Sequence, residues 1–325
     1  MGIMKWVRFV FLILAVPGCL CKPWCAETDR VSLLGFKSNI LSDTTGILDS
    51  WVGENCCEDW EGVKCDQSTG RVTSLVLQGP GEDSAVHEGH PVAFPGWAGV
   101  LGGSAGFWDE AHHRDDPEQA GLTRLTQLVL QDNSLEGNVP DVVGRITSLE
   151  GLLLSGNSFT GQIPRTLGNL RNVQQLSLSK NLLDGPIPPV FGSLQRLQFL
   201  DLSSNLLSGG IPEFPGRFPN LTNVDLSDNK LSGPIPISLL GISSISAISL
   251  SRNQLTGGIP VQVGNLKSVS KLDLGNNRLV GQIPASIGNL QSLWYLNLSR
   301  NGLSGNLPDS FDFGIPSLSD GSVLQ

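Results

Sequence analysis

A 24-residue repeat governs most of this sequence and restricts what the chain can fold into. Eight asparagines between positions 133 and 301 stand 24 residues apart without a slip in phase. Each is followed four residues later by a glycine, and a proline stands three residues beyond that glycine. A fixed period of this length is typical of a solenoid, in which each repeat forms one turn of a coil and contacts only its neighbours. The asparagines are Asn133, Asn157, Asn181, Asn205, Asn229, Asn253, Asn277 and Asn301.

The leucines of each repeat predict a strand that is buried on one face. In Leu200-Asp201-Leu202 the apolar residues alternate with a polar one, so the leucines point into the coil and the aspartate points out. Strands of successive coils are expected to pair in parallel at about 4.8 Å spacing, which gives a sheet of about nine strands. Each repeat asparagine follows its strand where the backbone turns. Because an amide both donates and accepts hydrogen bonds, we expect these asparagines to satisfy main-chain groups of neighbouring coils.

Residues 1–21 are predicted to be a secretory signal peptide. Lys5 and Arg8 give a basic start, an apolar run covers residues 9–16, and Pro17-Gly18 breaks it before small residues. The run is too short to span a membrane, and no other stretch approaches the ~20 apolar residues that a spanning helix needs. We therefore expect a secreted chain without a membrane span, located in the extracellular space or cell wall.

The cysteines that follow predict a disulfide-stapled cap over residues 22–66. Besides Cys19 and Cys21 in or beside the signal, the chain contains Cys25, Cys56, Cys57 and Cys65. Four cysteines in a short exported segment favour two disulfides over a metal site, and no histidine lies nearby. Adjacent cysteines can hardly bond each other without strain, so Cys56 and Cys57 should reach in opposite directions. Two connectivities remain open: Cys25–Cys56 with Cys57–Cys65, or Cys25–Cys57 with Cys56–Cys65.

A helix is predicted inside this cap, because a solenoid exposes its apolar core at the first coil and needs a lid there. Thr28-Asp29 can cap the helix, and Trp51 and Trp60 would pack beneath it. The strand pattern at residues 67–79 should form the first coil. The apolar stripe of the helix is Val31, Leu33, Leu34, Phe36 and Ile40.

Residues 80–121 are predicted to be an irregular insert, after which eight repeats occupy residues 122–309 and an irregular tail occupies 310–325. One hypothesis for the insert is a metal-binding or pH-sensing cluster around His112-His113 and Asp115-Asp116. We favour a solvated loop whose histidines act independently. All four histidines lie here: His87, His90, His112 and His113.

Several classes of function are excluded at this stage. The net charge is −9 and the pI about 4.9, so the basic surface that nucleic acid requires is missing. The same negative net charge disfavours binding of an anionic polysaccharide. Histidines occur only in the insert, so the repeats offer no pairing of a nucleophile with a histidine base, and a regular sheet offers no pocket. We expect no catalytic residue, cofactor or metal site.

The cap and the repeats together resemble the plant-specific class of extracellular leucine-rich repeats. The resemblance rests on the spacing and residues of Cys25–Cys65, including Trp51, and on the Leu-x-x-Asn-x-Leu-x-Gly-x-Ile/Val/Leu-Pro units of Leu122–Pro308. It implies a solenoid of the α/β repeat class with a parallel sheet on the concave face. Short or 3-10 helices and turns would form the convex face, and disulfides would cap a helical N-terminus. It also implies the pairing of Cys25 with Cys56 and Cys57 with Cys65, which we favour.

The resemblance also implies a function. The family includes polygalacturonase-inhibiting proteins, secreted defence proteins and the ectodomains of receptor-like proteins and receptor kinases, whose partners commonly dock on the concave face. We therefore expect a secreted, non-enzymatic module that recognises a protein, with an inhibitor of microbial cell-wall hydrolases as its sharpest form. The alternative is an ectodomain or fragment of a plant receptor-like protein or kinase at the plasma-membrane surface, which senses a peptide or hormone.

Specificity should reside in the outward positions of the strands, since the other residues of each repeat build the coil. An acidic, weakly aromatic group lies in the middle of the predicted sheet, and Trp294-Tyr295 lies near its C-terminal end. Aspartate also recurs between the leucines as an ordinary part of the repeat, which is the competing interpretation of the acids. The candidates for partner contact are Phe199, Asp201, Asn223, Asp225, Asp228, Arg252, Asp273, Trp294, Tyr295 and Arg300.

Two glycosylation sequons occur, Asn220-Leu-Thr222 and Asn297-Leu-Ser299. Asn220 precedes a predicted strand and should be accessible. Asn297 lies on the predicted recognition face, where a glycan would block the adjacent Trp294-Tyr295 pair.

Overall fold

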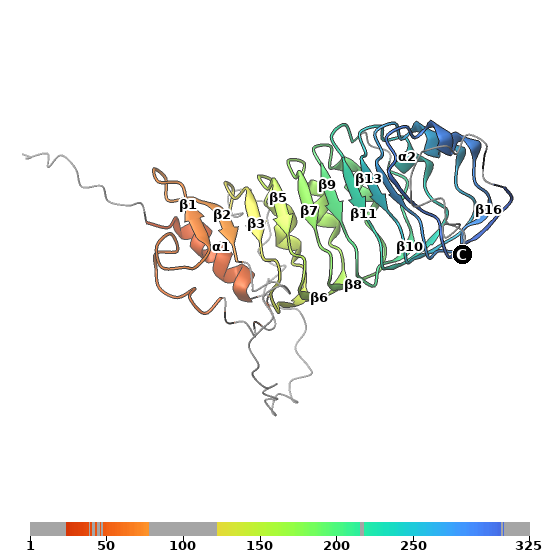
Figure 1. The fold of residues 1–325 in the computed structure, drawn as a ribbon. Helices are drawn as coiled ribbons and strands as arrows, with labels where there is room; N and C mark the ends of the chain where they lie inside the picture. Colours follow the sequence, from red (N-terminus) through yellow and green to blue (C-terminus); the bar gives the residue numbers. More distant parts are fainter. Residues whose placement is uncertain are drawn as a thin grey trace, which may run out of the picture.

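The protein is a curved row of stacked coils that begins at the cap and ends at the last repeat (Figure 1). The computed structural model describes residues 24–38, 40, 43, 46, 48–77, 122–214, 218–306 and 308. The predictions for the signal peptide, the insert and the irregular tail fall outside these residues. The parallel strands, the short helices opposite them and the disulfide-bonded N-terminus confirm the predicted fold class.

The principal sheet contains ten strands in the order β1-β2-β3-β5-β7-β9-β11-β13-β15-β17. Neighbouring strands of the repeats pair in parallel with a shift of 24 residues, so that Leu200 lies opposite Val224. The extra strand relative to the sequence prediction is β1, which belongs to the cap and pairs antiparallel with β2. The strands are β1 (Val63–Cys65), β2 (Val72–Val76), β3 (Gln127–Val129), β5 (Gly151–Leu153), β7 (Gln175–Ser177), β9 (Phe199–Asp201), β11 (Asn223–Asp225), β13 (Ala247–Ser249), β15 (Lys271–Asp273) and β17 (Tyr295–Asn297).

A second row of short strands follows the asparagine of each repeat and was not predicted. It forms three small parallel sheets, β4-β6-β8, β10-β12-β14 and β16-β18. The sequence shows no period-two signal there, because each strand has only two to five residues and lies around or just before the repeat glycine. The strands are β4 (Glu136–Asn138), β6 (Ser158–Gln162), β8 (Leu182–Asp184), β10 (Ser208–Gly210), β12 (Lys230–Gly233), β14 (Gln254–Leu255), β16 (Val280–Gln282) and β18 (Gly302–Ser304).

Short helices form the convex side, and most of them begin directly after the repeat proline. The ring fixes φ of that proline near −65°, which suits the residue before a helix, and its backbone is extended in each case. Adjacent helices approach so closely that a side chain on Gly144 would meet the backbone of Thr166 in the next coil. The helices are η4 (Asp141–Arg145), η5 (Arg165–Asn169), η6 (Pro189–Ser193), α2 (Ile237–Leu240), η7 (Val261–Asn265) and η8 (Ala285–Asn289).

The cap helix α1 (Glu27–Ser38) closes the first coil, but it differs from the prediction at its start. Thr28 and Asp29 lie inside the helix rather than capping it, and Val31 is 55% exposed. Leu33 and Phe36 are buried, and Leu34 and Ile40 are partly buried against the same core. The rings of Trp51 and Trp60 are buried in this core and stack with centroids 5.3 Å apart.

Asp29 has a different role from the predicted one, because its fully buried carboxylate ties the cap to the repeats. It accepts hydrogen bonds from the backbone N–H of Val72 at 2.7 Å and from Nε of Arg71 at 3.0 Å, and Nη2 of Arg71 lies 2.8 Å from its second oxygen. The same Nη2 donates to the hydroxyl of Thr123 at 2.9 Å, beyond the insert. A charge buried in this way is stable only because it is paired and hydrogen-bonded.

The repeat asparagines form the ladder that the sequence predicted. Nδ2 of Asn205 donates to the carbonyl oxygens of Leu178, Leu202 and Ser203 at 2.9–3.2 Å. Its Oδ1 accepts from the backbone N–H of Leu183, one coil earlier. The same pattern recurs in the other repeats, except that Oδ1 of Asn133 has no partner among the described residues. Each side chain therefore satisfies main-chain groups of two coils that water cannot reach.

The ladder makes a testable prediction for stability. Asn205→Ala should lower the free energy of unfolding by about 1–3 kcal/mol, because it leaves buried carbonyl and N–H groups without partners. Chemical denaturation of the purified protein measures the change. Asn265→Ala is the matched control, since Asn265 is exposed on the convex side and its replacement should be nearly neutral. Equal effects of the two substitutions would contradict the scaffolding role of the ladder.

The two ion pairs of α1 make a second prediction. Asp29→Ala should lower the free energy of unfolding by about 3 kcal/mol, because it leaves Arg71 and the N–H of Val72 without their buried acceptor. Glu27→Ala removes the exposed Glu27–Arg30 pair of the same helix and should leave stability unchanged. Thermal unfolding of both variants tests this. If Glu27→Ala lowered the stability while Asp29→Ala left it unchanged, the buried pair of Asp29 and Arg71 would not be the contact that ties the cap to the repeats.

Candidate recognition surface

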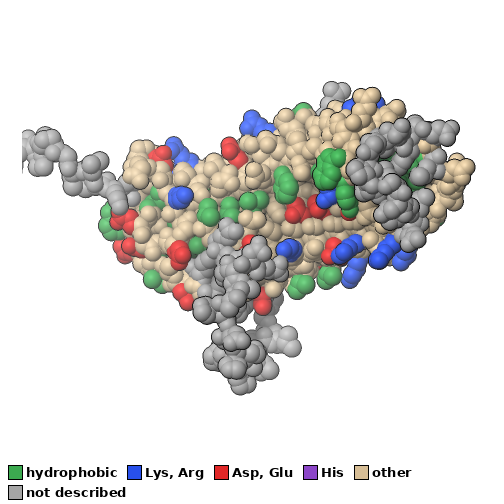
Figure 2. Space-filling model, in the orientation of Figure 1, with side chains coloured by type: hydrophobic (Ala, Val, Ile, Leu, Met, Phe, Trp, Pro, Cys, Tyr) green, Lys and Arg blue, Asp and Glu red, His purple; other side chains and the backbone are tan. Residues whose placement is uncertain are grey.

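The middle of the concave sheet carries an uncompensated row of acids. Asp201 and Asp225 lie opposite each other in register on β9 and β11, and Asp273 lies two strands further on. Figure 2 shows acidic side chains gathered over the middle of the row of strands, with hydrophobic side chains beside them. No ion pair compensates these three aspartates within the described part of the chain. This face can therefore attract a cationic group.

Each of these aspartates also has a local structural role, which explains why aspartate recurs in the repeat. Oδ1 of Asp201 accepts from the N–H and hydroxyl of Ser203, at 3.0 and 2.7 Å. Asp225 bonds Ser227 in the same way, and Asp273 accepts from the N–H of Gly275. These bonds use Oδ1 and fix the orientation of the carboxyl group. Among the described residues Oδ2 of Asp201 and Asp225 accepts no hydrogen bond, so the structural role leaves one oxygen on each for a ligand.

The residues beside the acids differ in exposure. Phe199, on the same strand as Asp201, leaves 37% of its surface exposed, and Asn223 opposite it is half-buried. At the corresponding positions of the N-terminal strands, less side-chain surface is exposed, since Gly151 has no side chain and Ser177 is buried. The structure thus brings Phe199, Asp201, Asn223 and Asp225 together as predicted, and contrasts them with a flatter N-terminal part of the sheet.

Three predicted residues, Asp228, Arg252 and Arg300, stand just before a repeat asparagine. Their backbone is left-handed, with φ between 53 and 56°, so they lie in the turn after the strand. All three side chains are exposed. Asp228 accepts from the hydroxyl of Ser204 at 3.3 Å, and Arg300 donates to Oδ1 of Asn276 at 3.3 Å. They form an edge of the concave face rather than its centre.

An aromatic cluster occupies the C-terminal end of the sheet. Trp294 is 63% exposed, and its ring meets that of Tyr295 edge to face with centroids 6.0 Å apart. Nζ of Lys271, opposite Tyr295 on β15, lies 5.5 Å from the centre of the Tyr295 ring. The sequence pattern did not identify Lys271 as a candidate residue, although its position 24 residues before Tyr295 places the two side by side. The cluster thus combines an exposed indole with a tyrosine held by a cation.

The Tyr295 hydroxyl is also held by polar neighbours. Burial raises the pKa of this hydroxyl, the Asp273 carboxylate adds to the rise, and a hydrogen bond with Asn297 opposes it. Asn297 in turn accepts from the N–H and hydroxyl of Ser299 at 3.1 and 2.7 Å. The ring contacts with Trp294 and Lys271 and the polar neighbours of its hydroxyl therefore hold Tyr295 within the cluster.

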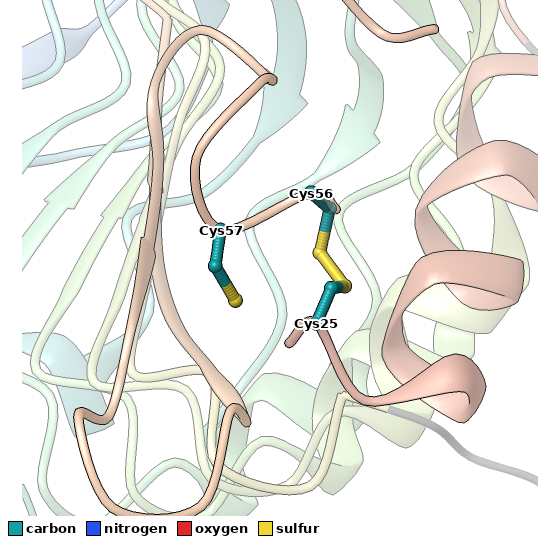
Figure 3. A group of neighbouring side chains, drawn as sticks. All are labelled: Cys25, Cys56 and Cys57. Atoms are coloured by element: carbon teal, nitrogen blue, oxygen red, sulfur yellow. A yellow bond between two sulfur atoms is a disulfide. The ribbon is translucent and has the colours of Figure 1, made fainter. Parts of the chain in front are cut away.

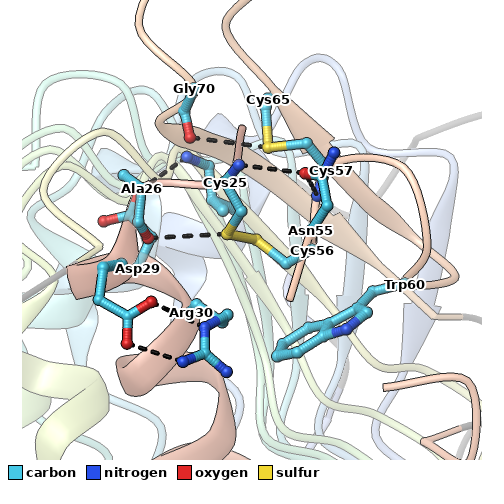
Figure 4. Close-up of a disulfide and its surroundings, with 12 residues drawn as sticks. Cys25, Ala26, Asp29, Arg30, Asn55, Cys56, Cys57, Trp60, Cys65 and Gly70 are labelled. Atoms are coloured by element: carbon cyan, nitrogen blue, oxygen red, sulfur yellow. Dashed lines mark hydrogen bonds and ion pairs between the residues drawn. A yellow bond between two sulfur atoms is a disulfide. The ribbon is translucent and has the colours of Figure 1, made fainter. Parts of the chain in front are cut away.

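The cap has the disulfide pairing that the resemblance implies. Cys25 bonds Cys56, and Cys57 bonds Cys65. Figure 3 shows the sulfur of Cys57 beside the first of these bonds, and the sulfurs of Cys25, Cys56 and Cys57 lie within 4.8 Å of one another. Because all of them are bonded in disulfides, they offer no thiolate to a metal. Asn55 joins the two bridges, since its Oδ1 accepts from the N–H groups of Cys25 and Cys57 at 3.1 and 3.3 Å (Figure 4).

Family models match both parts of the chain. The leucine rich repeat N-terminal domain matches residues 26–66, and the leucine rich repeat matches 147–207 in one model and 220–242, 268–290 and 292–313 in another. Among curated proteins, the chain is 37% identical over 127 residues to the DNA damage-repair/toleration protein DRT100 of Arabidopsis thaliana. That match covers 38% of this chain and 30% of DRT100.

Solved structures show the same fold in plant receptors. The ectodomain of the receptor kinase GASSHO1/SCHENGEN3 from Arabidopsis thaliana, in complex with CASPARIAN STRIP INTEGRITY FACTOR 2, is 33% identical with a TM-score of 0.70. The match covers 87% of this chain and 31% of the ectodomain. The Arabidopsis receptor kinase HAESA, with the peptide hormone IDA and the co-receptor SERK1, is 29% identical with a TM-score of 0.56, over 89% and 48% of the two chains. This chain therefore spans less than half the length of these relatives.

These similarities agree with the architecture. Within the described residues, no helix has the length and apolar character needed to cross a membrane. The cap, the repeats and the structural neighbours are all leucine-rich repeat domains. Receptor ectodomains with this fold are typically non-enzymatic. The chain belongs to the leucine-rich repeat family and is similar to its plant receptor ectodomains.

Proposed function

We propose that this protein is an exported recognition module that binds a peptide or an extended protein segment across its concave face. The observation that carries the proposal is the irregular set of side chains on β9–β17. Coil after coil, the inward leucines and the asparagine ladder stay constant, whereas the outward positions change from acid to aromatic to base. Positions that do not build the scaffold are free to determine a ligand.

The structural neighbours support a peptide as the ligand. The HAESA structure contains a peptide hormone, and the GASSHO1/SCHENGEN3 structure contains an integrity factor. The concave sheet here offers the same open form, with exposed Phe199 and Trp294 and free acids between them. An extended peptide can contact several strands at once, whereas a small molecule would need a pocket.

A second candidate function is inhibition of a microbial cell-wall hydrolase such as a polygalacturonase. The acids on β9, β11 and β15 favour it, because they would complement a basic enzyme surface. Both functions place the protein outside the cell, either in the cell wall or at the membrane surface beside a signalling partner. The disulfides of the cap support export, since such bonds persist in oxidising compartments.

The proposal predicts which substitutions abolish binding. Affinity capture from plant cell-wall fluid and pathogen secretions, with the exported chain as bait, should recover a partner. Asp225→Lys and Trp294→Ala should each weaken its binding by at least about tenfold, because one reverses the central charge and the other removes the most exposed aromatic side chain of the concave face. Calorimetry or surface plasmon resonance measures the affinities.

Control variants separate this effect from misfolding. Asp184→Lys makes the same charge change on β8, outside the concave sheet, and Val261→Ala removes an exposed apolar side chain from the convex side. Both should bind as the unmodified protein does. If the partner is a polygalacturonase whose activity the chain inhibits, inhibition replaces peptide sensing as the function. Full binding by the Asp225 and Trp294 variants would rule out the proposed face.

A further inference from the structure

We propose a specific ligand motif for the concave face. The ligand is an extended peptide in which a basic side chain, placed between Asp201 and Asp225, stands five or six residues from an aromatic or large apolar side chain, placed on Trp294 and Tyr295. The motif rests on the proposed function and defines the chemistry of its ligand. Three observations carry it: the acid pair, the aromatic cluster and the distance between them.

The acid pair selects the basic group. Asp201 and Asp225 are in register on adjacent strands, so two like charges lie about 5 Å apart at the backbone. Hydrogen bonds to Ser203 and Ser227 hold both carboxyl groups in place, and no cation of the described chain pairs with them. Like charges at this distance repel, and a guanidinium or ammonium between them removes the repulsion and bonds both. The site is therefore complementary to arginine or lysine.

The aromatic cluster selects the other group. Other coils place a small or polar side chain at the position of Trp294, as at Gln198, Thr222 and Ser270. Trp294 alone in this column presents a large ring, and 63% of it is exposed. Tyr295 beside it is already fixed by Lys271 and Asn297, so a ligand loses little entropy in ordering it. Exposed, pre-ordered aromatic rings are typical anchors for apolar side chains.

Lys271 favours one placement of the ligand over the reverse one. Its ammonium group sits over the Tyr295 ring, so a second cation placed on that ring would be repelled. Asp201 and Asp225 make no ion pair among the described residues. The basic residue of the peptide is therefore directed to the acid pair.

The spacing follows from the sheet. Three and a half strand intervals of about 4.8 Å separate the midpoint of β9 and β11 from β17, which gives about 17 Å across the strands. Asp225 is in register with Asn297, so Tyr295 and Trp294 lie two and three residues earlier in the chain. At about 3.3 Å per residue this offset adds about 7–10 Å along the strand direction, and the direct distance becomes about 18–20 Å. An extended peptide advances about 3.4 Å per residue, so this distance corresponds to about five or six residues.

Selection of random twelve-residue peptides on the exported chain tests the motif. The expected result is enrichment of peptides with Arg or Lys five or six residues from Trp, Phe, Tyr or Leu. A synthetic lead peptide should lose about tenfold or more in affinity when three Gly-Ser residues are inserted between these positions. The inference is overturned by enriched peptides with no preferred spacing or no basic residue, and also by the absence of enrichment.

Charge reversal supplies the control. Asp225→Lys should abolish binding of the lead peptide, and replacing the basic residue of the peptide by Glu should restore it. Asp184→Lys should bind the original lead normally. If a natural partner is captured through the concave face but its binding segment lacks the spacing, the motif fails while the proposed function stands. If nothing binds this face at all, both fail.

A separate observation concerns the glycosylation sequons, and from it we infer that the folded protein carries a glycan on Asn220 and none on Asn297. The amide of Asn297 lies flat over Gly275: a side chain carbon on that glycine would come within 2.4 Å of Nδ2 of Asn297. The other end of the amide is bonded to Ser299. Nδ2 is the atom that a glycan would modify, and here it faces the neighbouring backbone.

Asn220 offers the opposite environment. It is exposed in the turn before β11 and makes no hydrogen bond to the described residues. Thr222 of its sequon lies beside it at the start of the strand, also exposed. A glycan on Asn220 therefore fits the folded chain, while the surface around Trp294 and Tyr295 stays uncovered.

Peptide mapping of the protein secreted from plant cells tests this assignment. Glycosidase treatment should convert Asn220 to Asp and leave Asn297 unchanged. Thr222→Ala should remove the glycan and raise the electrophoretic mobility, whereas Ser299→Ala should leave the mobility unchanged. A glycan on Asn297 in the secreted protein, or an unmodified Asn220, would overturn the inference.

Discussion

The need to satisfy buried backbone groups at each turn is the constraint on which this fold depends. Where each strand ends, the chain turns away from the principal sheet in a place that water does not reach, and carbonyl groups such as those of Leu178 and Leu202 would lose their partners. One asparagine amide per coil takes the place of water. Its Nδ2 donates to carbonyl oxygens of two coils, and its Oδ1 accepts from a backbone N–H of the preceding coil. These bonds hold each turn in register with the turn of the coil before it.

A fixed period has a second consequence on the concave face. Every outward position forms a column across the sheet, so a residue meets the residues 24 positions before and after it. Single positions such as Gly151 and Ser177 expose little side chain at the N-terminal end of the sheet, whereas Trp294 stands out from a column of small and polar side chains. Recognition chemistry is thus produced by departures from the repeat, on a scaffold that keeps their distances constant.

The sequence predicted the parts of the structure that depend on one strong periodicity. The alternating leucines and the asparagines identify the principal strands and the ladder, because burial and turn geometry leave few other residues possible there. The short strands after each asparagine were missed, since two to five residues around a glycine carry no detectable period. Asp29 was misread as a helix cap, because its partner Arg71 is 42 residues away and local pattern cannot reveal that pair. The candidate residues of the face were found from columns, but the contact of Lys271 with Tyr295 required the register of the sheet.

The recurring aspartates show how a scaffold residue can also present a charged group on the concave face. A carboxylate has two oxygens, and in Asp201 and Asp225 the bond to the following serine uses only Oδ1. That bond holds the side chain in one orientation, so the remaining oxygen is presented without the entropy loss that a free aspartate would incur on binding. Structural recurrence therefore does not argue against a role in recognition. The bond within each turn also explains why a solenoid can place two like charges side by side, since each carboxylate is stabilised by its own turn. A cationic group bound between them would remove their mutual repulsion.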